Sequence, residues 1–254
     1  MTRARRRLLR WRCRVQRLLE AVLDLLFPRD CALCQGYVPT GHLCPACRKR
    51  LREAPLHTRC PRCGEEFPGL DAPATPCAAC REHPPAFRRA LIALRYDDNA
   101  RALIHAFKYH RGIHLTADFV RILRAKLRRE LPGVTFSAVV PVPITRAKLR
   151  TRGYNQAELL ARALARRLGL PCLHRLLIRH ETGVFSQTRL HRAERLANAR
   201  EAYALAPRAP SLAGQRLLLV DDVMTTGATA QACAEALASA GAEVYLLALA
   251  RPLR

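Results

Sequence analysis

The segment from Leu217 to Ala230 places the tightest limits on the fold of this chain. Its sequence, LLLVDDVMTTGATA, begins with four apolar residues, continues through Asp221 and Asp222, and ends in a loop of small residues. The apolar run predicts a short buried strand before the two acids, and the residues from Thr229 onward predict a helix. A strand that leads through such a loop into a helix N-terminus is suited to bind an anion, because backbone N–H groups and the helix dipole point at the ligand.

The side chains of this segment favour a sugar phosphate as that anion. Gly227 lets the backbone approach a ligand closely, and Thr225, Thr226 and Thr229 add hydroxyl donors. The two acids would repel a phosphate, so we expect them to bind sugar hydroxyls or a cation. The segment therefore predicts a ribose 5-phosphate site, and an ordinary strand-to-helix turn with capping threonines is the alternative.

Cysteine spacing predicts a metal-binding module before this domain. Of eleven cysteines, eight form four Cys-x2-Cys pairs, a pattern typical of metal ligands rather than disulfides in a chain without a secretion signal. Two pairs supply the four thiolates of one structural zinc, so we expect about two zinc ions. The simplest arrangement uses neighbouring pairs, and a nested arrangement that joins the second pair to the third stays open. The predicted ligands are Cys31, Cys34, Cys44, Cys47, Cys60, Cys63, Cys77 and Cys80.

The charge of the chain favours an anionic partner. Its formal net charge is +24, which suits nucleic acid, a membrane surface or a phosphorylated small molecule, although a solvated basic surface explains it equally well. Residues 1–27 predict an Arg-rich amphipathic helix, and docking on its own domain is favoured over contact with a membrane or nucleic acid. No apolar run is long enough to span a membrane, and Glu20 and Asp24 argue against a signal peptide, so we expect a cytoplasmic protein.

The remainder of the chain predicts an α/β domain. Apolar runs predict strands over 90–96, 136–143, 172–178, 217–220 and 244–250, and helical spacing predicts helices over 101–109, 116–131, 155–168 and 229–240. Continuous apolar strands are typical of a mostly parallel sheet covered by helices on both faces, which binds ligands at the carboxyl ends of its strands. Residues 146–152 predict a basic loop, and residues 180–201 predict a long polar loop or hairpin.

Several motifs in one order resemble a known family. They are the four cysteine pairs, Pro141-Val142-Pro143, Arg152-Gly153-Tyr154-Asn155-Gln156, and Val220-Asp221-Asp222-Val223-Met224-Thr225-Thr226-Gly227-Ala228-Thr229. Together they resemble the ComF (ComFC-like) family of competence-associated proteins, from Pro28 to Leu253. The resemblance implies a double zinc ribbon over 28–83, after the helix at 1–27, and a type I phosphoribosyltransferase-like domain over 84–254.

The family also implies a ligand and its site. The ligand is 5-phosphoribosyl 1-pyrophosphate (PRPP) or another ribose 5-phosphate. By this resemblance Asp221 and Asp222 hold the ribose hydroxyls, directly or through Mg²⁺, and take the catalytic role. The segment 146–152 then lies where pyrophosphate binds, and 180–200 corresponds to a flexible loop that closes over PRPP. The implied ligand-binding residues are Asp221, Asp222, Thr225, Thr226, Gly227, Ala228, Thr229, Arg152 and Arg195.

Three functions fit these features. The first is a phosphoribosyltransferase that forms a glycosidic bond at ribose C1. The second is a non-catalytic adaptor that binds single-stranded DNA and competence proteins during DNA uptake, motivated by the charge and the ribbons. The third is a PRPP sensor, which would bind PRPP without releasing pyrophosphate. No residue set identifies an acceptor for phosphoribosyl transfer.

Overall fold

The computed structural model describes residues 30–51, 59–67, 75–109, 112–180 and 202–252. The chain divides into two compact units, Met1–Lys49 and Arg50–Arg254. The first cysteine quartet lies in the first unit, and the second quartet lies in the same unit as the α/β sheet. The predicted helix at 1–27 lies outside the described residues. Among the helices that are described, none has the length and apolar composition needed to cross a membrane.

The larger unit is built on a four-stranded sheet with the order β1-β6-β5-β2. The strands are β1 (Arg89–Arg95), β2 (Ala138–Pro141), β5 (Arg216–Val223) and β6 (Glu243–Arg251). All three pairings are parallel. Nearly every central residue of these strands is buried, because helices or loops cover both faces. The predicted parallel sheet is confirmed.

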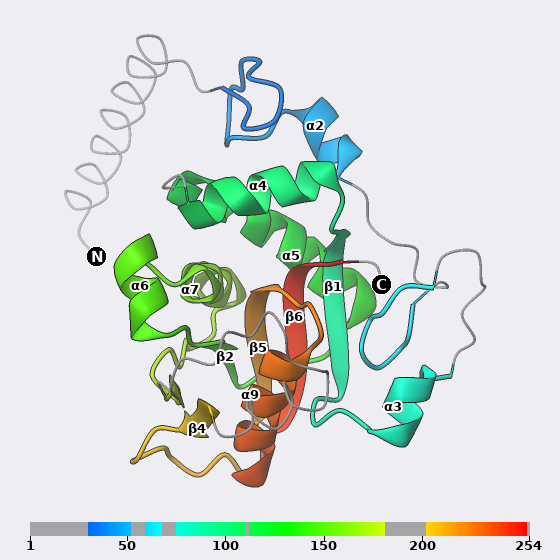
Figure 1. Cartoon of the computed structure of the whole chain (residues 1–254), viewed down its shortest axis with the longest axis vertical. Coiled ribbons are helices and arrows are strands. Elements are labelled where there is room, and N and C mark those ends of the chain that lie inside the picture. Colours follow the sequence, from blue (N-terminus) through cyan, green and yellow to red (C-terminus); the bar gives the residue numbers. More distant parts are fainter. Residues whose placement is uncertain (1–29, 52–58, 68–74, 110–111, 181–201, 253–254) are drawn as a thin grey trace, which may run out of the picture. The chain divides into compact units, whose positions relative to one another are not determined.

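Helices lie on both faces of this sheet (Figure 1). Helices α5 (Thr116–Glu130) and α7 (Gln156–Leu168) pack together on one face, while α9 (Ala228–Ser239) packs on the other. Helix α4 (Asp98–Tyr109) joins α5 through an edge-to-face contact of Phe107 with Phe119, with ring centroids 5.1 Å apart. A short 3-10 turn, η2 (Gly112–Leu115), precedes α5. Residues 224–227 thus lie where β5 passes into α9.

Side-chain caps set the ends of the helices that flank the site. The Oδ1 of Asn155 accepts the N–H of Ala157 at the start of α7, while its Nδ2 donates to the carbonyl of Val142. Residues 146–152, predicted as a loop, instead form helix α6 (Arg146–Arg152). The loop prediction was wrong because Thr145 caps this segment by accepting the N–H of Lys148, and Gly153 ends it with φ +80°.

A second correction concerns the strand predicted over 172–178. Cys172 makes only an isolated bridge to Val139, and the strand proper is β3 (Leu177–Arg179). It pairs antiparallel with β4 (Tyr203–Leu205), with Arg179 opposite Tyr203. The prediction failed because His174 and Arg175, which lie within the predicted strand, form a turn. Residues 181–201, predicted as a long loop or hairpin, join these two strands and lie outside the described residues.

Candidate functional site

The eight paired cysteines form two quartets, one from each pair of neighbouring Cys-x2-Cys motifs. Within each quartet the four sulfur atoms lie within 4.8 Å of one another. Cys34 and Cys44 have their sulfurs 3.8 Å apart, and so do Cys63 and Cys77. These separations match the edge of a tetrahedron with Zn–S bonds of about 2.3 Å, and they are far too long for a disulfide. The residues therefore fit zinc, and sequential rather than nested pairing is confirmed.

The two quartets repeat one backbone pattern. Cys31 N–H bonds to the carbonyl of Gly36, and Cys60 N–H bonds to the carbonyl of Glu65, each at 2.8 Å. The third cysteine of each quartet donates its N–H to the sulfur of the first, at 3.4 Å and 3.3 Å respectively. A short helix follows in each case, α2 (Pro45–Arg50) and α3 (Ala78–Glu82). The double ribbon is therefore an internal structural repeat.

Donated N–H groups favour the thiolate form that a metal needs. Burial opposes ionisation of Cys31, but N–H groups of Cys44, Cys34 and Leu33 outweigh it and lower the pKa of Cys31 to about 6. Hydrogen bonds from Cys63 and Cys80 lower the pKa of Cys60. Each quartet thus contains one cysteine that is readily deprotonated, as expected for a ligand set that binds metal near neutral pH.

The two repeats differ at the residue after the first Cys-x2-Cys pair. Gln35 holds a positive φ of 59° with a side chain, whereas the second ribbon has Gly64 at φ +67°. A Cβ on Gly64 would lie 2.9 Å from Cγ1 of Ile92 in β1, so the glycine permits close docking of this ribbon on the sheet. Arg59 strengthens the docking, because its Nη1 donates to the carbonyl of Ile92 at 2.5 Å.

The segment after β5 forms the predicted loop into a helix N-terminus. Gly227 is the N-cap of α9 with φ +85°, and as a glycine it supplies no side-chain cap. The Thr226 hydroxyl accepts the N–H of Ala228 at 3.3 Å, and Thr229 shares a side-chain hydrogen bond with Tyr203. We call residues 224–229 the phosphate loop. Its exposed face combines helix N–H groups and threonine hydroxyls at the positive end of α9.

The two acids lie inside β5 rather than after it, because the ladder to β6 continues as far as Val223 and Ala250. Asp222 forms an ion pair with Lys108 of α4, with Oδ2 and Nζ 2.9 Å apart. Burial, together with the adjacent charge of Asp222, raises the pKa of Asp221 to about 8. The site thus holds two adjacent carboxyl groups, and one lysine is not enough to neutralise both when they are ionised.

Basic side chains gather near these acids. Burial and the charges of Arg179, Arg152 and Lys108 lower the pKa of Lys148, and Asp222 opposes the shift. Arg152 lies over the ring of Tyr109, with its Cζ 5.1 Å from the centroid, and donates to the Tyr109 hydroxyl. We call Lys108, Lys148, Arg152 and Arg179 the basic cluster. The mutual repulsion of these cations is relieved by an anion placed among them.

The structure brings most of the predicted site residues together. Asp221, Asp222 and the phosphate loop are contiguous at one end of β5, and Arg152 lies within electrostatic range of Lys148. Arg195 lies outside the described residues. The sequence did not single out Lys108, Arg179 or Tyr203, because each reaches the site through tertiary packing and none belongs to a local motif.

Comparisons with known proteins agree with this architecture. The double zinc ribbon domain family matches residues 22–81, and the phosphoribosyl transferase domain family matches residues 155–252. The DNA utilization protein YhgH of Escherichia coli O157:H7 is 30% identical over 230 residues, which cover 86% of this chain and 94% of that protein. The chain belongs to the ComF family. Competence protein F of Haemophilus influenzae is 29% identical over 231 residues, and Competence protein ComFC of Bacillus subtilis is 26% identical over 235 residues.

As a ComF protein, the chain combines a double zinc ribbon with a phosphoribosyltransferase-like α/β domain. ComFC of B. subtilis is covered over 91% of its length, and Competence protein F over 96%. Among solved structures, one of adenine phosphoribosyltransferase is 18% identical with a TM-score of 0.37, covering 55% of this chain and 73% of that one.

Proposed function

We propose that this ComF protein binds PRPP at the carboxyl end of β5 and transfers its phosphoribosyl group to an acceptor. The observation that supports this most directly is that two adjacent acids at the end of β5 lie close both to the N-terminus of α9 and to the basic cluster. A molecule with a phosphate at one end, hydroxyls in the middle and a pyrophosphate at the other end offers a partner for each of these groups.

Each part of the ligand has a proposed partner. The phosphate loop, from Thr225 to Thr229, binds the 5′-phosphate through backbone N–H groups and hydroxyls. Asp221 and Asp222 accept hydrogen bonds from the ribose 2′ and 3′ hydroxyls. The basic cluster binds the pyrophosphate, with Arg152 and Lys148 supplied by α6, and Arg195 is a further proposed contact.

The acid pair also fits Mg²⁺. Burial and the adjacent Asp222 raise the pKa of Asp221, and a hard divalent cation with oxygen ligands would neutralise such a pair of carboxylates. Mg²⁺ bound here with PRPP would offset the negative charge of the ligand. Asp221 and Asp222 would hold the ion, and Lys108 would shift toward the pyrophosphate.

The chemistry proposed for these residues is a displacement at ribose C1. The bond from C1 to the pyrophosphate oxygen breaks, the acceptor forms a new bond to C1, and pyrophosphate leaves with the electron pair. Lys148 and Arg152 stabilise the charge that develops on the leaving group, because they are cations held near that position before reaction. The phosphate loop keeps the sugar fixed while the bond changes.

Titration calorimetry with PRPP and Mg²⁺ tests the site. We expect wild type to bind, Asp222→Ala to lose affinity by about tenfold or more, and Asp98→Ala to bind as wild type. Asp98 is a matched control because it lies on the same helix as Lys108, and its exposed side chain pairs with the exposed Arg101. Absence of heat from wild type, or an unchanged signal from Asp222→Ala, would refute a PRPP site.

A screen for pyrophosphate release separates transfer from sensing. PRPP is incubated with wild type and candidate acceptors, namely bases, amines and nucleic acids, and Asp222→Ala is the control. Release that requires one acceptor and the intact acids supports a transferase. Tight PRPP binding without release by any acceptor supports the sensor function instead.

A second function, binding of single-stranded DNA, is favoured by one surface feature. A groove of about 740 Å³ lies between α5 and α7, and arginines from both helices line it. They are Arg121, Arg124, Arg128, Arg166 and Arg167. Such a groove matches a sugar–phosphate backbone and the family's names, which refer to competence and DNA utilization.

Oligonucleotide binding at several salt concentrations tests this second function. We expect Arg128→Glu with Arg166→Glu to weaken binding and flatten the dependence on salt, because each lost phosphate contact reduces counterion release. An unchanged salt slope in that double variant would refute the groove as the DNA site.

We expect a cytoplasmic location, because zinc thiolates persist where cysteines stay reduced.

A further inference from the structure

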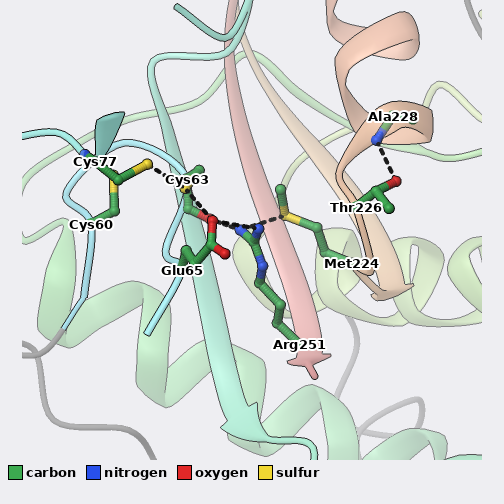
Figure 2. Close-up of polar contacts among 8 residues, drawn as sticks. All are labelled: Cys60, Cys63, Glu65, Cys77, Met224, Thr226, Ala228 and Arg251. Atoms are coloured by element: carbon green, nitrogen blue, oxygen red, sulfur yellow. Dashed lines mark hydrogen bonds and ion pairs between the residues drawn. The ribbon is translucent and has the colours of Figure 1, made fainter. Parts of the chain in front are cut away.

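A buried arginine at the end of β6, Arg251, joins the second cysteine ribbon to the sheet. Its side chain is only 5% exposed. One guanidinium nitrogen, Nη1, donates to the carbonyl of Cys63 at 2.6 Å, and Nη2 lies 3.3 Å from Oε2 of Glu65. Figure 2 shows the guanidinium beside the turn that carries these two residues. Arg251 therefore holds a metal-ligand turn from a residue 188 positions later in the sequence.

The same guanidinium also contacts the phosphate loop. Its Nη1 lies 4.0 Å from Sδ of Met224, the first residue of that loop. Met224 is 3% exposed, and its N–H bonds to the carbonyl of Ala250 at 3.0 Å. Its methyl group lies against Gly227, because a Cβ built on that glycine would be 2.8 Å from Cε. Met224 thus lies beside Arg251 (Figure 2) and also contacts Gly227, the N-cap of α9.

These contacts form a continuous path from a metal ligand to the phosphate-binding backbone. The path runs from Cys63 through Arg251 and Met224 to Gly227. A thioether is flexible and a weak acceptor, so Met224 takes its position from the groups packed around it. The rigid group among them is the guanidinium, which is fixed by two oxygen acceptors on the ribbon.

We infer that the second cysteine ribbon is a support of the phosphate site: it fixes Arg251, which positions Met224 and through it the phosphate loop. The inference rests on the proposed function, since it gives the ribbon a role at the same site. The sulfur geometry of the second quartet fits zinc. A bound zinc ion would therefore hold the turn from Cys63 to Glu65 in the conformation that accepts hydrogen bonds from Arg251. Loss of metal at this quartet then loosens the phosphate loop, and ligand binding slows loss of the metal.

Arg95 supplies a matched control. It lies at the end of the neighbouring strand β1, directly opposite Arg251 in the parallel ladder. It anchors the same ribbon through an ion pair with Glu66, and within the described part of the chain its side-chain hydrogen bonds go to Glu66 rather than to the phosphate loop. Replacing Arg95 therefore weakens ribbon docking in general, whereas replacing Arg251 also removes the path to Met224.

Hydrogen–deuterium exchange of the ligand-free, zinc-loaded chain is the first test. We expect Arg251→Met to raise exchange at the amides of Met224 and Ala228 by about tenfold, the effect of one lost hydrogen bond to a charged group. Arg95→Met should change exchange there by less than about twofold. Equal exchange at these amides in the two variants, with zinc retained, would overturn the inference.

Cysteine alkylation with peptide mass spectrometry is the second test, because it distinguishes the quartets in one sample. With a zinc chelator present, PRPP should slow alkylation of Cys77 and Cys80 in wild type and in Arg95→Met, but not in Arg251→Met. Cys34 and Cys44 of the first quartet serve as the internal reference. A general loss of stability would accelerate alkylation in both variants without removing the effect of PRPP.

Two outcomes separate this inference from the proposed function. If PRPP does not protect the phosphate loop of wild type, the proposed function fails, and ligand-free exchange still decides the inference. If PRPP protects the loop but leaves alkylation of Cys77 unchanged, the inference fails and the PRPP site stands. Should Arg251→Met not fold, Met224→Leu replaces it: it keeps the apolar volume, loses the sulfur contact, and must also abolish the effect of PRPP on Cys77.

Discussion

Replacing Asp221 with asparagine should stabilise the ligand-free protein at pH 8. Burial and the neighbouring Asp222 raise the pKa of Asp221 from 3.8 to about 8, so the folded chain disfavours its charged form. Asparagine has nearly the same shape as the protonated acid. Its Oδ1 can accept the N–H of Asp222 as Asp221 Oδ1 does now, at 2.8 Å. The substitution thus removes an unfavourable charge and keeps the local hydrogen bond.

The sign of the pH dependence follows from proton binding. Below about pH 4 both folded and unfolded states carry a protonated Asp221, so the residue has no effect on stability there. Between about pH 4 and pH 8 only the folded state keeps the proton, so stability falls as pH rises, by up to about 1.4 kcal/mol per pH unit. Because Asp221 is partly exposed and solvent screens its charge, we expect a total advantage of about 2 to 3 kcal/mol for asparagine at pH 8.

Urea unfolding followed by circular dichroism measures this effect. Urea is preferred to guanidinium chloride because a salt would screen the charges. Asp222→Asn is the control: it makes the same chemical change one residue later but leaves Lys108 without its ion-pair partner, so it should destabilise by about 1 to 2 kcal/mol near neutral pH. A lower stability of Asp221→Asn at pH 8, or a difference from wild type that does not vary with pH, would refute this reasoning.

Three further predictions concern the metal, the phosphate loop and a helix cap. Elemental analysis should show that Cys34→Ser and Cys77→Ser each lower the zinc content from about two ions per chain to about one. Loss of both ions in either variant would contradict the view that the two quartets bind zinc independently. Gly214 has φ +71° and open space around it, so Gly214→Ala should lower the free energy of unfolding in urea by about 1 kcal/mol. Gly227→Ala should lower it by more, because the added Cβ would contact Met224. Equal losses in the two variants would contradict that packing. Asn155→Ala should destabilise by about 2 kcal/mol by the same assay because it removes two hydrogen bonds, and a neutral effect would contradict the cap.

Local sequence patterns predicted the two cysteine quartets and the strand, loop and helix around Gly227 correctly in outline. Each quartet depends on two Cys-x2-Cys motifs close in sequence, so spacing alone sufficed to group them. The loop between β5 and α9 likewise follows from adjacent residues. The strand before it was predicted too short, because the apolar run ends at Val220 while the hydrogen-bonded ladder continues through Asp221 to Val223.

What the sequence did not reveal depends on contacts between distant segments. Lys108 reaches Asp222 only because α4 lies beside the end of β5, and its own helix carries no motif. Arg251 contacts Cys63 and Met224 from a strand whose sequence looks entirely structural. Helix α6 was missed for a different reason: its run of arginines and lysines suggested a loop, and the capping by Thr145 outweighed that composition.

The position of β6 in the sheet has a consequence for how the protein is made. In the described sheet β6 lies between β1 and β5, and β1 pairs with no other strand. Strand β6 is also the last strand of this sheet to leave the ribosome. The apolar strand β1 therefore has no paired strand while most of the domain is being synthesised. An unpaired apolar strand favours aggregation of nascent chains. The second cysteine quartet needs only nearby residues to bind zinc, and its ribbon packs on Ile92 of β1, so it is able to form before β6 and to cover part of β1 early.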